Sequence, residues 1–164
     1  MKQVQYSGFE LDHFDSAINF RHYQLSLIKE YLKDNFLEVG AGKGGFAMVY
    51  KKILRNITLI EPDKILFKIL KKKFKDKNIS IENKSINNLK KKFKTIIYFD
   101  VLEHIRKDLL EVKTAASKLK PGGYLIFSVP AYQLFYSDFD KSVGHFKRYN
   151  KNDFRKKSKK SGLE

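Results

Sequence analysis

The sequence predicts an α/β fold built on a doubly wound, mostly parallel sheet. Apolar runs that suit buried strands alternate with amphipathic segments that suit helices. The connections are short, and a glycine-rich turn at 40–45 follows the first apolar run. Strand–helix alternation with short turns favours right-handed crossovers between parallel strands, so one sheet covered by helices on both faces is expected.

The first elements lead into and out of the glycine turn. A helix is expected over 17–33, because apolar residues recur there at helical spacing. The positions of its apolar stripe are Ile18, Leu25, Ile28, Tyr31 and Leu32. A strand over 35–39 precedes the turn, a helix over 44–53 follows it, and a second strand covers 57–61. The two strand segments are short, continuous apolar runs, as is typical of parallel strands that are buried on both faces.

The remaining elements continue the alternation. Asp63 is expected to cap a helix that carries apolar residues at 65, 66, 69 and 70. A short third strand follows at 79–81, and the β-rich run 95–99 suits the central strand. The next helix is expected to run through Leu119 and to stop at the Lys-Pro-Gly-Gly sequence of 120–123, before a fifth strand over 124–129.

The composition describes a folded and strongly basic chain. Its 164 residues are 42% hydrophobic and 14% aromatic, which favours one globular domain over disorder. The absence of cysteine excludes a disulfide framework and a cysteine nucleophile. No apolar stretch approaches the roughly twenty residues of a membrane-spanning helix, so a cytoplasmic protein is expected. The net charge of +16 would attract nucleic acid, but its lysines are scattered over several elements, which favours a solvated surface.

A nucleoside-bearing cofactor is predicted from the glycine turn and the acid that follows it. Glycines at 40, 42 and 44 allow backbone N–H groups to approach a ligand closely. Glu61 ends the second strand, twenty-one residues after Gly40, where a carboxylate can hold two ribose hydroxyls. Because Gly45 also completes the dinucleotide fingerprint, the glycines alone do not exclude NAD.

Glu38 and the order of the later motifs favour a different cofactor. A carboxylate just before the turn would repel a pyrophosphate but can accept from an amino-acid ammonium. Over about 20–163, the chain resembles the class I S-adenosylmethionine-dependent methyltransferases, whose first motif is an acid-x-Gly-x-Gly-x-Gly loop, here 38–44. The resemblance implies a Rossmann-like fold and S-adenosyl-L-methionine as the cofactor.

The same resemblance implies a set of cofactor-binding residues. They are Glu38, Gly40, Ala41, Gly42 and Gly44 at the methionine end, Glu61 with the adjacent Pro62 at the ribose, Ser85 and Ile86 at the adenine, and Asp100 on the cofactor floor. Ser85 departs from the family pattern, which places an aspartate there. A serine hydroxyl can still accept one hydrogen bond from an adenine amino group.

The segment from Asp100 to His104 is the second candidate cluster. Asp100, Glu103 and His104 are spaced i, i+3 and i+4, so on a helical turn all three side chains would point the same way. A capping acid and a packed histidine would explain the same pattern without a function. In ubiquinone-pathway and small-RNA methyltransferases a similar acid-x-x-Glu-His segment binds a divalent metal, and His145 is the candidate for a further ligand. Whether a metal binds here is left open.

A long aromatic segment after the fifth strand is expected to cover the site. It ends in Gly-His-Phe-Lys-Arg-Tyr at 144–149, a pattern that resembles bacterial methyltransferases encoded among sugar, cell-envelope and glycolipid genes. His145 could take a proton from a hydroxyl, and Arg148 could hold an anionic group or form a surface ion pair. Residues 19–23 resemble the family's N-terminal lid helix.

The predicted function is methyl transfer from S-adenosyl-L-methionine to a small-molecule acceptor, at oxygen, with His104, His145 and Glu103 as the catalytic residues. One alternative keeps the chemistry and uses the basic surface to bind RNA. Another is a shortened, non-catalytic partner or remnant domain. The single domain, 1–164, is expected to comprise a lid helix (1–33), a cofactor-binding core (34–130) and a substrate loop with the start of the next helix (131–164). The sequence ends where the family adds a C-terminal strand pair, so an exposed sheet edge and a homodimer are also expected.

Overall fold

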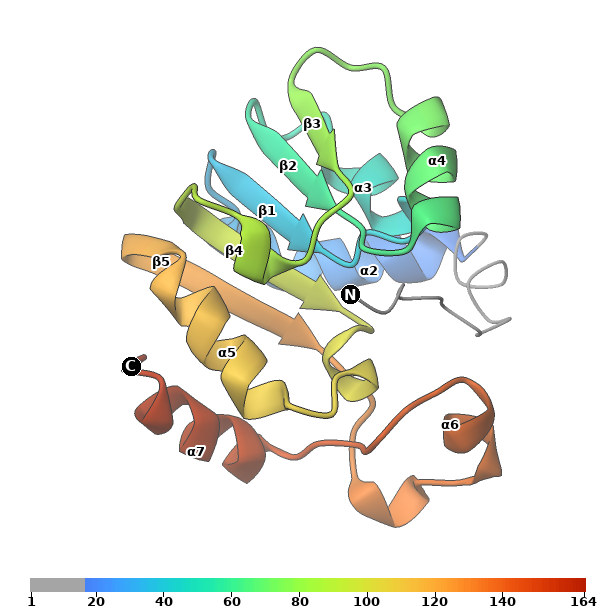
Figure 1. The fold of residues 1–164 in the computed structure, drawn as a ribbon, viewed down its shortest axis with the longest axis vertical. Coiled ribbons are helices and arrows are strands. Elements are labelled where there is room, and N and C mark those ends of the chain that lie inside the picture. Colours follow the sequence, from blue (N-terminus) through green and yellow to red (C-terminus); the bar gives the residue numbers. More distant parts are fainter. Residues whose placement is uncertain (1–16) are drawn as a thin grey trace.

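The computed structural model describes residues 17–164 and contains one sheet of five parallel strands in the order β3-β2-β1-β4-β5 (Figure 1). The strands are β1 Phe36–Val39, β2 Ile57–Ile60, β3 Ile79–Glu82, β4 Phe93–Phe99 and β5 Leu119–Ser128. At the last position of β1, Val39 pairs with Ile60 on one side and Tyr98 on the other. The strand order reverses between β1 and β4, and ligands of open α/β sheets bind at the carboxyl ends of such strands.

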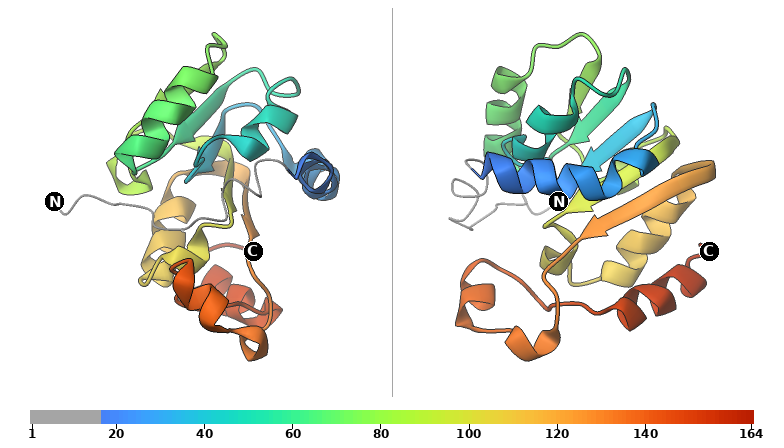
Figure 2. Two further views of the ribbon diagram at one scale, coloured as in Figure 1. Left: turned by 90° about the vertical axis from the view of Figure 1, so that its right-hand side faces the viewer. Right: turned by 180° about the vertical axis from the view of Figure 1, so that it is seen from behind.

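Helices cover both faces of this sheet, as predicted (Figure 2). The helices that pack on one face are α2 Ile18–Ile28, α3 Gly45–Tyr50 and α4 Lys64–Lys73. On the other face lies α5 Asp108–Ser117, against which α7 Lys151–Lys160 packs. The remaining elements are α6 Asp138–Ser142 and the 3-10 turns η1 Lys29–Tyr31, η2 Ile86–Asn88, η3 Leu102–His104 and η4 Gln133–Phe135.

Alternation along the strands builds two cores. In β1, Phe36 faces a cluster with Tyr50 of α3, whereas Leu37 faces a cluster with Ile86 and Ala115 on the opposite side. All of these side chains are fully buried. Because a parallel sheet buries both faces, its strands are apolar at nearly every position, which is what made them recognisable in the sequence.

The capping prediction at Asp63 is confirmed. Its Oδ1 accepts hydrogen bonds from the backbone N–H groups of Ile65 and Leu66 at 2.7 and 2.9 Å, which satisfies two donors of the first turn of α4. The cap fixes the direction in which the chain leaves β2, and so the position of the turn that carries Glu61 and Pro62.

Three helix boundaries differ from the prediction. The helix expected over 17–33 is α2 followed by the tighter turn η1, and the helix expected over 44–53 ends at Tyr50. The helix expected to include Leu119 ends at Ser117, because Leu119 pairs with Phe93 at the start of β5. The Lys-Pro-Gly-Gly sequence therefore lies inside β5 as a bulge. Leu119 pairs with Phe93 and Tyr124 pairs with Thr95, so β5 advances five residues where β4 advances two. Residues 1–16 of the predicted N-terminal segment lie outside the described residues.

One buried acid connects α5, α7 and the segment that follows β5. Asp108 contacts the ammonium groups of both Lys147 and Lys157, and the hydroxyl of Tyr149 donates to it at 3.1 Å. Burial alone would raise the pKa of Asp108, but the two lysines outweigh it and hold that pKa below its ordinary value. The acid is thus ionised at neutral pH and joins α5 to α7 and to the segment that directly precedes α7.

Within residues 17–164 every strand is parallel, and β5 forms one edge of the sheet. No helix in this part of the chain has the length and apolar character needed to cross a membrane.

Candidate functional site

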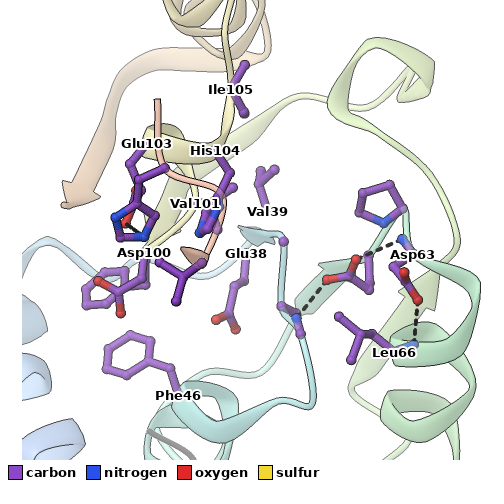
Figure 3. A pocket seen from close by; sticks show the side chains of 18 of the residues that line it. Glu38, Val39, Phe46, Asp63, Leu66, Asp100, Val101, Glu103, His104 and Ile105 are labelled. Atoms are coloured by element: carbon purple, nitrogen blue, oxygen red, sulfur yellow. Dashed lines mark hydrogen bonds and ion pairs between the residues drawn. The ribbon is translucent and has the colours of Figure 1, made fainter. Parts of the chain in front are cut away.

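A cavity of about 660 Å³ opens at the carboxyl ends of the central strands. Its walls are the glycine loop after β1, the turns after β2 and β3, the segment after β4, and residues from the long segment that follows β5 (Figure 3). Small-molecule sites typically measure about 300–1,000 Å³, so the cavity is large enough for a cofactor together with part of a second molecule.

The glycine loop has the backbone that only glycine adopts easily. The φ angles of Gly40, Gly42 and Gly44 are 68°, 55° and 79°. A Cβ on Gly40 would lie 2.7 Å from a methyl carbon of Val101, so the loop and the segment after β4 approach too closely for a side chain. The N–H groups of Gly40 and Ala41 donate to the Ile60 carbonyl, which fixes the loop against β2.

Gly44 differs from the other glycines because it does not line the cavity. A Cβ there would lie 2.3 Å from the ring of Phe74 and 2.8 Å from Leu70. The structure therefore gives Gly44 a packing role between the loop and α4, beside the cofactor-binding role expected for it from the sequence.

Glu61 holds the glycine loop in place. Its two carboxylate oxygens accept hydrogen bonds from the N–H groups of Gly42, at 2.8 Å, and Asp63, at 2.9 Å (Figure 3). Burial raises the pKa of Glu61, and these two N–H groups oppose that rise. A carboxylate has about four acceptor directions, so each oxygen keeps capacity for a ligand hydroxyl.

Pro62, Ser85 and Ile86 form the neighbouring wall. The amide of Asn83 donates to the carbonyls of Glu61 and Pro62 at 2.8 and 3.1 Å, and thereby joins the turn after β2 to the turn after β3. This wall is apolar at Ile86, which is fully buried, and polar at Ser85.

Two acids and one cation lie on the floor of the cavity. Glu38 accepts a hydrogen bond from the hydroxyl of buried Tyr50, and Figure 3 shows the Glu38 and Asp100 carboxylates pointing the same way, beside Phe46. Nη1 of Arg21 donates to Asp100 at 3.3 Å. Burial raises the pKa of Asp100, and the Arg21 guanidinium opposes that rise.

The Asp100–His104 segment does not form the helical turn expected from its spacing. Asp100 has a φ of 55°, and only Leu102–His104 forms a 3-10 turn. Asp100 therefore faces Arg21, while Glu103 and His104 face His145. The i, i+3, i+4 argument placed all three residues together and was wrong for Asp100.

Glu103, His104 and His145 converge at the far end of the cavity. The rings of the two histidines are 4.7 Å apart, and Nε2 of His145 is 4.0 Å from a carboxylate oxygen of the fully buried Glu103. Within residues 17–164, one ligand atom from each of the three residues lies within 4.8 Å of the others. Burial, with His145 beside it, lowers the pKa of His104 to about 4, so its ring is neutral at pH 7.

Asp140 orients His145. Its buried carboxylate accepts from Nδ1 of His145 at 2.9 Å and from the guanidinium of Arg148 at 2.9–3.1 Å. Burial would raise the pKa of Asp140, but Arg148 and His145 outweigh it and hold that pKa far below its ordinary value. Because an ionised carboxylate only accepts, Nδ1 carries a proton, which leaves Nε2 as the nitrogen with the lone pair in the neutral ring.

The structure thus brings most of the residues expected from the sequence to one cavity. All except Gly44 line it. Sequence reasoning gave no individual role to Arg21, which it placed only within the lid-like segment 19–23, and it missed Asp140. Asp140 has a signal in the sequence, because Ser137 and Asp140 have capping-box spacing and form that box at the start of α6. For Arg148, the structure favours the ion-pair interpretation over an anion site.

The family profile described as "Methyltransferase domain" matches residues 11–164. The chain belongs to this family. The match covers most of the sequence and confirms the expected class I S-adenosylmethionine-dependent methyltransferase. No match was found among curated proteins.

Several solved methyltransferase structures share the fold at low sequence identity. A methyltransferase from Thermotoga maritima is 20% identical with a TM-score of 0.75, over 94% of this chain and 76% of that one. Magnesium protoporphyrin IX methyltransferase from Synechocystis, with bound SAH, is 16% identical with a TM-score of 0.71, over 99% and 78%. A Clostridium acetobutylicum S-adenosylmethionine-dependent methyltransferase is 19% identical with a TM-score of 0.62, and this chain, matched over 75% of its own length, spans 55% of it.

Proposed function

We propose that this methyltransferase transfers the methyl group of S-adenosyl-L-methionine to a hydroxyl oxygen of a small-molecule acceptor. Methyl transfer and the cofactor follow from the family; the acceptor and its reacting atom are the proposal. The observation that carries it is one continuous cavity with Glu61 and the glycine loop at one end and Glu103, His104 and His145 at the other.

The cofactor is assigned to the end formed by the strand-end loops. The remaining acceptor capacity of Glu61 suits the two ribose hydroxyls, and Ser85 with Ile86 suits the adenine. Glu38 and the loop at 40–42 lie beside the methionine moiety. Because the sulfonium already activates the methyl group, the protein mainly aligns the nucleophile, the methyl carbon and the sulfur.

His145 is the proposed general base. The acceptor oxygen attacks the methyl carbon, the carbon–sulfur bond breaks with its electron pair on sulfur, and the hydroxyl proton passes to Nε2 of His145. Asp140 supports this role, since it accepts from Nδ1 and stabilises the imidazolium that forms. The carboxyl group of Glu103, 4.0 Å from Nε2, is a further neighbour of that imidazolium.

A divalent metal is a second proposal, favoured by the cluster of Glu103, His104 and His145. Two imidazoles and one carboxylate suit Mn²⁺, Zn²⁺ or Fe²⁺ better than Mg²⁺. The hydrogen bond from His145 to Asp140 is the kind that metal-ligating histidines make with a carboxylate. Such an ion would act as a Lewis acid on the acceptor oxygen. Titration of the purified protein with each metal ion, with the His104→Gln variant as control, separates this proposal from the general-base proposal.

Two measurements test the proposed function. Calorimetric titration with S-adenosylhomocysteine, with NAD as control, is expected to show binding of the first ligand alone. Transfer of a labelled methyl group to panels of small alcohols, phenols and amines is then expected to favour the hydroxyl compounds. Transfer to amines alone, or to RNA alone with a steep salt dependence, would overturn the proposed acceptor. Failure of the folded protein to bind S-adenosylhomocysteine would favour a non-catalytic partner domain. The cytoplasmic location and the homodimer stay predictions.

A further inference from the structure

Arg106 is an exposed cation of the cavity wall. It follows His104 by two residues, and its guanidinium carbon lies 4.9 Å from the centroid of the Phe146 ring, which is adjacent to His145 in the sequence. Within residues 17–164, no carboxylate forms an ion pair with Arg106. Arginine is charged at any physiological pH and carries five N–H donors, so those of Arg106 are available to a ligand.

The other cations that line the cavity are placed differently. Three of them come from α2, the glycine loop and the turn after β3, namely Arg21, Lys43 and Lys84. The fourth is Arg148, and the buried carboxylate of Asp140 accepts from both its Nε and its Nη2. The sequence analysis considered Arg148 for an anionic group, but its fork is already occupied by an acid. Arg106 is therefore the better placed cation beside the two histidines.

The ring of Phe146 supports the Arg106 guanidinium. The backbone N–H of Phe146 donates to the carbonyl of Glu103 at 2.8 Å, which holds the ring beside the turn that precedes Arg106. A cation over an aromatic face is attracted by the ring quadrupole, so the contact restricts the guanidinium while its edge donors stay accessible. Less conformational freedom is then lost when an anion binds.

The segment that carries His145 also supplies apolar walls to the cavity. They are formed by Pro130, Phe139, Val143 and Phe146. Val143 is buried, whereas the rings of Phe139 and Phe146 are about half exposed. Ligand sites typically combine such apolar walls with a few polar groups that fix the orientation of the ligand. An apolar body against these walls and a negative charge at Arg106 would match this arrangement.

We propose that Arg106 binds an anionic group, a carboxylate or a phosphate, on an acceptor whose apolar body packs against Phe139, Val143 and Phe146. An arginine fork matches the oxygens of either anion. This inference rests on the proposed function and names its substrate class: a hydroxyl compound with an apolar, ring-sized body and a negative charge. Arg106 then determines which hydroxyl compounds are held beside His145, and it takes no part in the methyl transfer.

The test uses three probes of similar size: 3-phenylpropionate, phenyl phosphate and the neutral 3-phenylpropionamide. Each is titrated by calorimetry into protein saturated with S-adenosylhomocysteine, which has no methyl group to transfer. At least one anionic probe is expected to bind about tenfold more tightly than the amide. Arg106→Gln should weaken binding of that probe about tenfold and change binding of the amide less than about twofold.

Two further variants separate a specific site from general attraction to a basic protein. Lys107→Gln removes the same charge from the neighbouring exposed position, and should change the affinity of each probe less than about twofold. Phe146→Leu keeps an apolar wall without the ring, and should weaken binding of the anionic probe about two- to fivefold.

Three results would overturn the proposal. They are equal effects of Arg106→Gln and Lys107→Gln, equal affinities of the amide and the anionic probes, and binding of none of the probes. The titrations are repeated without S-adenosylhomocysteine. If the folded protein does not bind S-adenosylhomocysteine, that result counts against the proposed function, whereas the probe affinities still decide whether Arg106 binds an anion.

Discussion

The glycine loop and the segment after β5 face each other across one cavity, but different contacts hold them. At the glycine loop, backbone groups dominate: N–H groups donate to the Ile60 carbonyl and to Glu61. At the opposite end, side chains from three parts of the chain meet, with Asp140 holding His145 and Arg148, and Glu103 coming from the segment after β4. Changes at one end should therefore leave the other end largely intact.

His145→Gln should have the largest effect on turnover. Loss of a general base lowers kcat by about 10²- to 10⁴-fold, whereas S-adenosylhomocysteine affinity should stay within about threefold. Steady-state kinetics and calorimetry measure the two quantities. His22→Gln, at an exposed position of α2, is the control. An unchanged kcat would remove His145 from the chemistry.

Glu61→Gln should produce the converse pattern. The variant loses the charge that accepts from the Gly42 amide, and with it the charge-assisted bonds to the ribose. The dissociation constant of S-adenosylhomocysteine should rise about 10- to 100-fold. The exposed Glu30→Gln variant should bind normally. A Glu61→Gln protein that binds as tightly as the parent would disprove the ribose assignment.

Gly40→Ala tests whether the cofactor end depends on backbone conformation. Its φ of 68° and the 2.7 Å approach to Val101 add strain and a clash, so the free energy of unfolding should fall by about 2 kcal/mol. Gly122→Ala is the matched control, because its φ is 65° but nothing lies within 4 Å, and it should cost about 1 kcal/mol. Urea denaturation measures both, and equal losses would exclude the close contact as a cause.

Asp140→Asn should reduce kcat about tenfold by removing the charge that orients His145 and stabilises its imidazolium. Cofactor affinity should not change, because Asp140 lies outside the cofactor end. The neighbouring Asp138 is almost fully exposed, so Asp138→Asn is the control. Equal kcat values for the two variants would mean that Asp140 serves only the capping box of α6.

The smallest expected effect is the contribution of His104 to the pH dependence of the free energy of unfolding. Its pKa of about 4 in the folded protein is below the ordinary value of 6.5, so the unfolded chain takes up the proton first as the pH falls. This group therefore destabilises the fold progressively from about pH 6.5 to 4. In metal-free buffer, His104→Gln should lose less stability over this window than His22→Gln. Identical pH profiles would contradict the shift.

Local patterns explain what could be predicted from the sequence. The buried strands, the Asp63 cap and the glycine loop each depend on neighbouring residues, so composition and spacing reveal them. Arg21 could not be found in this way, because its burial depends on how α2 is rotated against the sheet. The apolar stripe predicted that Ile18 would face the sheet. In the structure Ile18 is 59% exposed, whereas Arg21 and Gln24 are buried.

The acceptor end needs side-chain geometry that spacing does not encode. Asp100 lies three residues before Glu103, yet its left-handed backbone turns it toward Arg21. Asp140 reaches His145 and Arg148 only because α6 and the following loop fold back on themselves (Figure 1). The sequence identified two of the contacting partners, His145 and Arg148, but not the acid between them.

The sharing of Asp108 between Lys147 and Lys157 makes the loss of either lysine contact less costly. If a single lysine held the acid, moving that lysine would leave a buried carboxylate without a cation. Here Lys157 on α7 still contacts the Asp108 carboxylate if Lys147 moves away, so the acid keeps a cation beside it. The junction between α5 and α7 therefore keeps its ion pair whether or not Lys147 stays in contact with Asp108.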